Sequence, residues 1–330
     1  MLINLHSHLE GRVRPETATE LARQLGIPDP DDGWARAIRV ERPGTLTEYL
    51  AKVAATYPFF RSPDAVRRIA CEAVEDAAAG GLDYLELRFG PATHATDRYG
   101  IDDIVSAVAE GMREGSRSTG VLVGAVVAAL RHHDPEVNAA VALSAARHAG
   151  DGVVGFDLAG DELLYPQLEP HREAFAIARA AGLGVTCHAA EAAEGSAARR
   201  AVELLGATRI GHGAHIADDK DVLTWAADHG VMIEVCPTSN WFTGAIASLE
   251  EHPAPIFRDA GIRLVLGDDN PRQTGTELAH EREVLRSPLG WTEADDAALD
   301  RASIDAAFLE SWQRADLQER LEGPLPPSAV

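Results

Sequence analysis

Eight short apolar runs recur along this chain of 330 residues, and a segment of helical periodicity follows each of them. Continuous apolar runs of this length are typical of parallel strands that are covered on both faces. Eight strand–helix units in succession predict an α/β fold, the (β/α)8 barrel. We find no linker or repeat, and we expect a single domain over residues 1–330. The runs occupy residues 2–8, 82–89, 121–130, 152–159, 183–189, 208–212, 231–236 and 262–267.

Two regions are expected to add helices to these units. Between the first and second runs, the patterns predict helices over 15–26, about 45–60 and 63–79. Residues 292–322 predict a further helical stretch at the C-terminus, which ends at the Gly-Pro pair that follows it.

The balance of charge restricts the partners of this protein. It has 30 basic and 52 acidic residues, which gives a net charge of −22 at pH 7. A field of this sign repels phosphate backbones and anionic membrane surfaces, so we expect neither nucleic acid nor a membrane as a partner. A neutral or cationic small molecule is the expected ligand.

Cysteine usage favours the cytoplasm. The three cysteines, Cys71, Cys187 and Cys236, are odd in number and far apart, which suits a reducing compartment. No signal segment opens the chain, and no apolar run has the roughly 18 residues that a membrane span needs. We therefore predict a cytoplasmic protein.

Polar residues stand at the C-terminal ends of four of the apolar runs, where a barrel carries its functional groups. The first two histidines are two residues apart on a strand, so their side chains point to the same face. Imidazole and carboxylate ligands without sulfur suit zinc or a similar divalent metal ion. These residues are His6 and His8 at the end of the first run, His188 at the end of the fifth with Glu191 just after it, His212 at the end of the sixth, and Asp268 and Asp269 just after the eighth.

Each of these residues also has a purely structural explanation. His188 could be a buried strand histidine, Glu191 an acid that favours a helix start, and Asp268 a helix cap. That all of these explanations hold together at four strand ends is less plausible than one shared site. The other histidines lie in loops or helical stretches and are expected at the surface: His94, His148, His171, His215, His229, His252 and His280.

The scarcity of lysine restricts the kind of metal site. Many barrel hydrolases with an H-x-H motif hold two metal ions bridged by a carbamylated lysine on the fourth strand. The run 152–159 contains no lysine, and the chain has only Lys52 and Lys220, both in helical segments. We therefore predict one metal ion per chain.

Taken together, these motifs resemble the adenosine/adenine deaminase family of the metal-dependent amidohydrolases. The resemblance extends over almost the whole chain, and the combination of motifs is highly specific. The motifs are HSHLEG at 6–11, YLELRF at 84–89, GFDLAGDE at 155–162, HAAE at 188–191, RIGHG at 209–213, CPTSN at 236–240, TGA at 243–245, DNP at 269–271 and TGTEL at 274–278.

The resemblance implies zinc-dependent hydrolysis of a 6-aminopurine, which gives the 6-oxopurine and ammonia. The family pattern places the metal-binding aspartate two residues before Pro271, which selects Asp269 over Asp268. The implied ligands of a single Zn²⁺ are His6, His8, His188 and Asp269.

The same resemblance assigns the remaining roles. Glu191 would protonate ring nitrogen N1 of the purine, and His212 would orient and help to deprotonate the attacking water. Asp269 would carry a proton toward the leaving ammonia. The Gly160 backbone would contact N3, and Asn270 would bind N7, where many members have aspartate.

Two departures from the family pattern leave the substrate open. Glu10 stands where nucleoside-acting members have an aspartate that binds a ribose hydroxyl, and adenine-acting members commonly have glutamate there. The motifs after Cys236 are more similar to those of nucleoside deaminases. Ala190 replaces the usual glycine, so its methyl group is expected to narrow the site.

We favour adenosine or a related nucleoside as substrate, with Glu10 as a substrate-binding residue. The alternatives are free adenine or a modified nucleoside such as aminodeoxyfutalosine. A mononuclear-zinc amide or ester hydrolase on the same barrel is a different class, and it would not need Glu191 as a proton donor. A catalytically silent binding relative would not need the intact ligand set.

Overall fold

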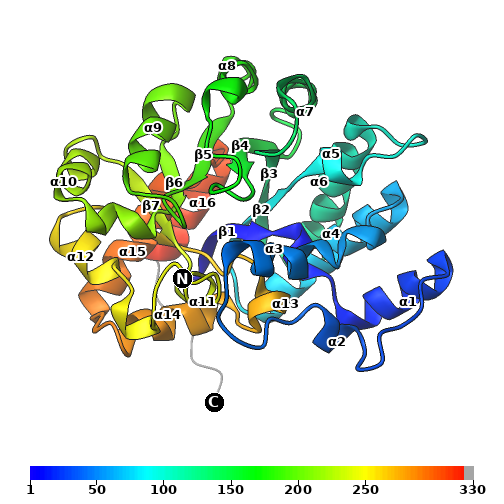
Figure 1. Cartoon of the computed structure of the whole chain (residues 1–330), viewed down its shortest axis with the longest axis horizontal. Coiled ribbons are helices and arrows are strands. Elements are labelled where there is room, and N and C mark those ends of the chain that lie inside the picture. The colour runs from blue at the N-terminus through cyan, green and yellow to red at the C-terminus, as the bar shows by residue number, and fades with distance from the viewer. Residues whose placement is uncertain (323–330) are drawn as a thin grey trace.

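A computed structural model describes residues 1–322, and these form eight parallel strands in the order β1 to β8 (Figure 1). The backbone of β1 is also hydrogen-bonded to the segment that follows β8, because His8 N donates to Asp269 O at 2.7 Å. The ring of strands is thereby closed, and the predicted (β/α)8 barrel is confirmed. Each predicted apolar run contains one strand. The strands are β1 (Ile3–His8), β2 (Tyr84–Phe89), β3 (Leu122–Leu130), β4 (Val153–Ala159), β5 (Gly184–Ala189), β6 (Arg209–His212), β7 (Met232–Val235) and β8 (Leu264–Leu266).

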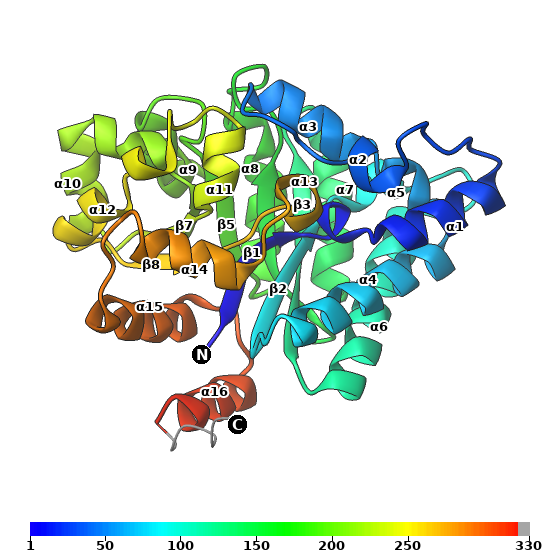
Figure 2. The same ribbon diagram turned by 90° about the horizontal axis from the view of Figure 1, so that it is seen from below.

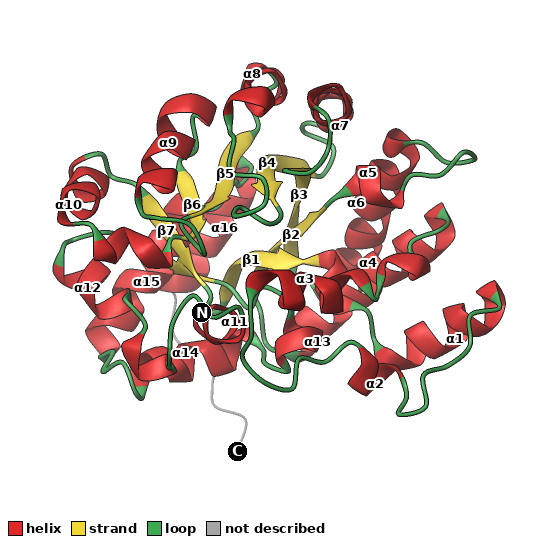
Figure 3. Ribbon diagram, in the orientation of Figure 1, coloured by secondary structure: helices red, strands yellow, loops and turns green. Residues whose placement is uncertain are grey.

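Helices surround the strands and bury the outer face of the sheet (Figure 3). Their apolar side chains and those of the strands form one large core around the barrel. The helices of this layer are α4 (Pro63–Ala79), α6 (Ile101–Thr119), α7 (Pro135–Arg147), α8 (Arg172–Ala180), α9 (Ser196–Leu205), α10 (Lys220–Asp228), α12 (Ala254–Asp259), α14 (Leu278–Arg286) and α15 (Glu293–Ala306).

Further helices are additions to the eight units. Within residues 1–322, no helix has the length and apolarity needed to cross a bilayer. The additional helices are α1 (Pro15–Leu25), α2 (Trp34–Ala37), α3 (Leu46–Ala54), α5 (Pro91–His94), α11 (Pro237–Phe242), α13 (Pro271–Thr274) and α16 (Ser311–Glu322).

Two of the predicted helices are divided in the structure. The expected helix over about 45–60 is α3 followed by a separate 3-10 turn over Tyr57–Phe59, because Pro58 has no backbone N–H to continue the α-helical hydrogen bonds and its ring would clash with the carbonyl four residues earlier. The expected stretch 292–322 is α15 and α16, which are separated by residues 307–310. Its predicted Gly-Pro end lies outside the described residues.

The segment between α15 and α16 closes the end of the barrel opposite α3 (Figure 2). The Phe308 ring lies over the Arg209 guanidinium, with 3.8 Å from Cζ to the ring centroid. Phe308 N also donates to Glu86 Oε1 at 2.6 Å. Gly184 at the start of β5 leaves room for this ring, since a Cβ there would lie 2.1 Å from Phe308 Cδ1.

Replacement of Gly184 by alanine is therefore expected to destabilise the fold. Forcing an extra methyl group against Phe308 costs roughly 1–3 kcal/mol of unfolding free energy, measured by chemical denaturation. The Phe308→Leu change should recover part of this loss in the double variant. Gly80→Ala is the control, because its Cβ would meet ordinary contacts of 3.5 Å. A Gly184→Ala variant as stable as the parent would contradict this packing.

Candidate functional site

The predicted site residues converge at one end of the barrel, beneath α3. They surround a cavity of about 330 Å³, whose opposite wall is the inner face of α3. The ends of seven strands, all except β7, contribute lining residues to the cavity, as the strand-end rule predicts. The predicted residues that line it are His8, Glu10, Gly160, His188, Glu191, His212, Asp269 and Asn270.

Four side chains form a cluster with the character of a metal site. His6, His8, His188 and Asp269 each offer one ligand atom, and these atoms all lie within 4.8 Å of one another. His8 Nε2 lies 3.1 Å from His188 Nε2 and 3.2 Å from Asp269 Oδ1. In the described part of the chain, the buried His6 Nε2 has no hydrogen-bond partner. Buried nitrogen and oxygen atoms that converge in this way fit a divalent cation.

Two buried carboxylates hold the outer side of these histidine rings. His6 Nδ1 lies 2.7 Å from Glu234 Oε2, and His188 Nδ1 lies 2.9 Å from Asp157 Oδ2. A proton shared with a carboxylate at Nδ1 leaves the lone pair of Nε2 directed into the cluster. Sequence reasoning missed Glu234 and Asp157. Their signal was a charged residue within an otherwise apolar strand, where burial requires a partner.

Asp268 and Asp269 point in different directions. Asp269 Oδ1 joins the cluster, whereas Asp268 Oδ2 accepts from Arg12 Nη2 at 2.6 Å. The placement of Asp269 agrees with the register that Pro271 sets. Cys236 is buried beside this region but is not part of the cluster.

Glu191 has the properties of an acid at neutral pH. It lies on the turn after β5, and burial, followed by the nearby Asp269 carboxylate, raises its pKa to about 8. Its Oε2 lies 3.8 Å from His212 Nε2. Burial, followed by the neighbouring His6, lowers the pKa of His212, so its imidazole is neutral. A protonated carboxyl and a neutral imidazole therefore face the same cavity.

One carboxylate fixes the turn that carries Glu191. Glu162 Oε2 accepts from Ala190 N at 3.0 Å, and its Oε1 accepts from Ala192 N at 2.5 Å and Ala193 N at 2.9 Å. Sequence reasoning included Glu162 in a motif but gave it no role. Its contacts orient the backbone on both sides of Glu191.

Backbone strain is concentrated at these strand ends. Within residues 1–322, the non-glycine residues with positive φ are Ala190 (54°), His212 (64°) and Asp269 (54°). This left-handed conformation favours glycine, which explains why glycine is usual at the position of Ala190. Ala190 is buried and is not among the described residues that line the cavity. The expectation that its methyl group narrows the site is therefore wrong.

Glu10 lines the cavity and has a partner that sequence reasoning missed. Its Oε1 accepts from Gly90 N at 3.1 Å and lies 2.8 Å from His94 Nε2. Burial raises the pKa of Glu10, but the contacts with His94 and then with Gly90 N outweigh it, so that the pKa is lowered overall. The carboxylate is therefore ionised, with Oε1 already engaged.

Three histidines expected at the surface are buried. His94 stacks on Phe60, with 4.3 Å between ring centroids, and pairs with Glu10. His171 Nδ1 lies 3.0 Å from Asn138 Nδ2, and His252 Nε2 lies 3.3 Å from Asn240 Oδ1. The expectation was wrong because polar partners distant in the chain satisfy these rings inside the fold.

Gly160 and Asn270 form other parts of the cavity wall. Gly160 has a φ of 110°, a conformation that L side chains rarely adopt. Asn270 packs closely on Gly11, where a Cβ would lie 2.5 Å from Asn270 Cα. Asn270 Oδ1 is buried and has no hydrogen-bond partner within the described residues, so a polar group remains available beside the cavity.

Comparisons with known proteins identify relatives of this chain. The chain is 35% identical over 321 residues to an adenosine deaminase of Shewanella denitrificans, with 96% of each chain covered. An amidohydrolase from Burkholderia ambifaria with bound zinc has a TM-score of 0.87 at 27% identity, covering 97% of this chain and 89% of that one. The N6-methyl-AMP deaminase of Arabidopsis thaliana has a TM-score of 0.85 at 27% identity, covering 97% and 95%.

The family model that matches is "Adenosine deaminase", and the match extends over residues 2–324. The resemblance stated from the motifs is thus confirmed over nearly the full length of the chain. This protein is a hydrolytic deaminase that belongs to the adenosine deaminase family.

Proposed function

We propose that this enzyme hydrolyses adenosine or a closely related 6-aminopurine nucleoside with one water molecule, and that the products are the 6-oxopurine nucleoside and ammonia. One observation carries the proposal. Glu191, a buried carboxyl group whose pKa is raised to about 8 by burial and by Asp269, faces the same cavity as a cluster of three histidines and one aspartate. Addition of water to an aromatic ring needs both a strong nucleophile and a proton on the ring nitrogen.

We infer that a single Zn²⁺ belongs to this cluster, with His6, His8, His188 and Asp269 as its ligands. When bound, zinc lowers the pKa of water to about 7 and so supplies hydroxide at neutral pH. Both lysines lie outside the residues that line the cavity, which supports one metal ion over a carbamate-bridged pair.

Side chains of the site would transfer the protons that the reaction requires. Glu191 donates a proton to the purine ring nitrogen as the C6–O bond forms. His212, neutral in this site, orients the attacking water and accepts its proton. As the C6–N bond breaks and the C6 hydroxyl becomes the carbonyl, the hydroxyl proton passes through Asp269 to the departing amine, which leaves as ammonia. The proton held by His212 then returns to Glu191, whose Oε2 lies 3.8 Å from His212 Nε2. Glu162 and Glu234 do not contact the substrate in this scheme. Glu162 holds the turn that carries Glu191, and Glu234 holds the ring of His6.

The charge of the cavity favours an uncharged substrate. Among residues 1–322, the lining contains no lysine or arginine, whereas Glu10, Asp161 and Glu191 all contribute carboxyl groups. A phosphate group would lack a cationic partner and would lie near ionised Glu10. We therefore infer a nucleoside rather than a nucleotide, with Glu10 accepting a hydrogen bond from a ribose hydroxyl.

We place this activity in the cytoplasm, with a small molecule as the partner. The three cysteines form no disulfide in the described residues, and the net charge of −22 disfavours nucleic acid and anionic membranes.

Replacement of Asp269 is expected to remove the metal, and the same change at Asp268 is the matched control. Asp269→Asn should lower zinc affinity by at least about 100-fold. Even the loss of a residue that only hydrogen-bonds to a metal ligand lowers metal affinity about 10–100-fold. Asp268→Asn should retain one zinc per chain. The zinc content per chain of the purified variants is measured by elemental analysis. Two metal ions per parent chain, or metal loss in the Asp268 variant alone, would contradict the assignment.

Removal of the acid at Glu191 is expected to lower kcat with zinc and fold unchanged. Glu191→Gln cannot donate the ring proton, so kcat should fall by about 10²–10³. Glu194→Gln, on the same turn but exposed, should behave as the parent. Since the protonated form is required, parent activity should fall as the pH rises through about 8. A fully active Glu191→Gln enzyme would favour the amide-hydrolase alternative.

Substrate preference tests the role of Glu10. Glu10→Ala should raise KM for adenosine about 10-fold, as expected for a charged hydrogen bond of about 1.5 kcal/mol or more, and should leave KM for adenine nearly unchanged. In the parent, kcat/KM for AMP should be at least about 100-fold below that for adenosine, because like charges oppose. Steady-state ammonia release measures all three substrates. A parent that prefers adenine would overturn the nucleoside assignment and leave the deaminase intact.

A further inference from the structure

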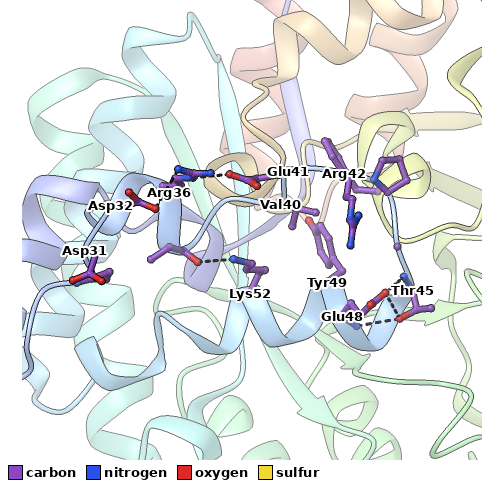
Figure 4. Close-up of a pocket in the computed structure, with 15 residues that line it drawn as sticks. Asp31, Asp32, Arg36, Val40, Glu41, Arg42, Thr45, Glu48, Tyr49 and Lys52 are labelled. Atoms are coloured by element: carbon purple, nitrogen blue, oxygen red, sulfur yellow. Dashed lines mark hydrogen bonds and ion pairs between the residues drawn. The ribbon is translucent and has the colours of Figure 1, made fainter.

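Helix α3 has open space on both of its sides. Its inner face lines the cavity that holds the site residues, and its outer face borders a cleft of about 680 Å³. Figure 4 shows residues that line this outer cleft, among them Val40, Tyr49 and Lys52. Tyr49 is a lining residue of both spaces, although its side chain is only 2% exposed.

Specific side-chain contacts hold α3 against the barrel. Thr47 Oγ1 donates to Asp161 Oδ2 at 2.6 Å, on the loop after β4. Tyr49 OH donates to Asp269 Oδ2 at 3.0 Å, across 220 positions of sequence. Of these two contacts, the second ends on a proposed metal ligand.

The two oxygens of Asp269 have different partners. Oδ2 accepts from Tyr49 and also from Ser239 Oγ at 2.6 Å, on α11. An ionised carboxylate can only accept, so both hydroxyls act as donors. Oδ1 is left facing the histidines, at 3.2 Å from His8 Nε2. Tyr49 and Ser239 thus fix which oxygen is presented to a metal ion.

We propose that Tyr49 is a positioning residue that couples the closure of α3 to metal binding at Asp269. With α3 closed, the tyrosine hydroxyl holds the carboxylate in its ligating orientation. A bound metal ion fixes the same carboxylate and thereby retains α3. This coupling is reciprocal by thermodynamic necessity. The inference rests on the metal site of the proposed function but requires no deamination.

The coupling has a consequence for the reaction. Leu46, Leu50 and Val53 of α3 form an apolar part of the cavity wall. Their position over the metal cluster excludes water from the bound purine when α3 is closed. The ligand geometry and the enclosure of the substrate would therefore form together.

Hydrogen exchange of residues 46–54, with and without zinc, tests the coupling. In the parent, zinc should slow exchange of α3 at least about 5-fold, the lower end of typical coupling between sites. In Tyr49→Phe, which keeps the ring and loses the hydroxyl, zinc should change the exchange of α3 less than about 2-fold, and zinc affinity should fall several-fold.

Two variants serve as matched controls. Ser239→Ala removes the other donor to Asp269 Oδ2, so it should weaken zinc affinity but keep the effect of saturating zinc on α3. Thr47→Val removes the other anchor of α3, so it should speed exchange in both states and keep their ratio. These controls separate the coupling from a general loss of hydrogen bonds.

The contrary outcomes are distinct. Equal exchange of α3 in the apo and zinc-loaded parent, or an unchanged zinc effect in Tyr49→Phe, would overturn the role of Tyr49. If zinc protects α3 through Tyr49 but the parent releases no ammonia from any aminopurine, the proposed substrate reaction fails and the coupling stands.

Discussion

A buried network of charges supports both the barrel and the site. Arg88 pairs with Asp157 at 3.1 Å and with Glu234 at 2.9 Å, and Arg209 pairs with Glu234 at 2.7 Å, all with fully buried side chains. A buried charge without a partner destabilises a fold by several kcal/mol, so every member must be satisfied. His6 Nδ1 lies 2.7 Å from Glu234 and His188 Nδ1 lies 2.9 Å from Asp157, so the carboxylates of this network also orient the histidine rings at the proposed metal site.

The network also connects the two ends of the barrel. Phe308 N bonds to Glu86, Glu86 pairs with Arg209, and Arg209 pairs with Glu234, which holds His6. The C-terminal segment thus closes the floor of the barrel and contacts the same charges that orient the histidines. At the other end, α3 contacts Asp269 through Tyr49. Contacts from both ends of the barrel therefore position proposed metal ligands, namely His6 and Asp269.

Strain at the strand ends has identifiable compensation. Left-handed conformations at residues other than glycine cost of order 1–3 kcal/mol each and persist only where surrounding contacts determine them. Ala190 N bonds to Glu162, Asp269 N bonds to His6 O, and His212 Nδ1 lies 3.2 Å from Asn240 Nδ2. The strain is located where side chains must turn from the strands into the cavity.

The sequence by itself determined the barrel, because strand and helix periodicities are local and each apolar run carries its own strand. It also determined the H-x-H pair and the set of residues at the strand ends, since parallel strands present those ends together. Only the tertiary structure decided how Glu234, Asp157 and His94 pair, and that Tyr49 reaches Asp269. Such contacts join residues far apart in the chain, and their partners are defined only when the ring closes and side-chain directions are fixed by packing.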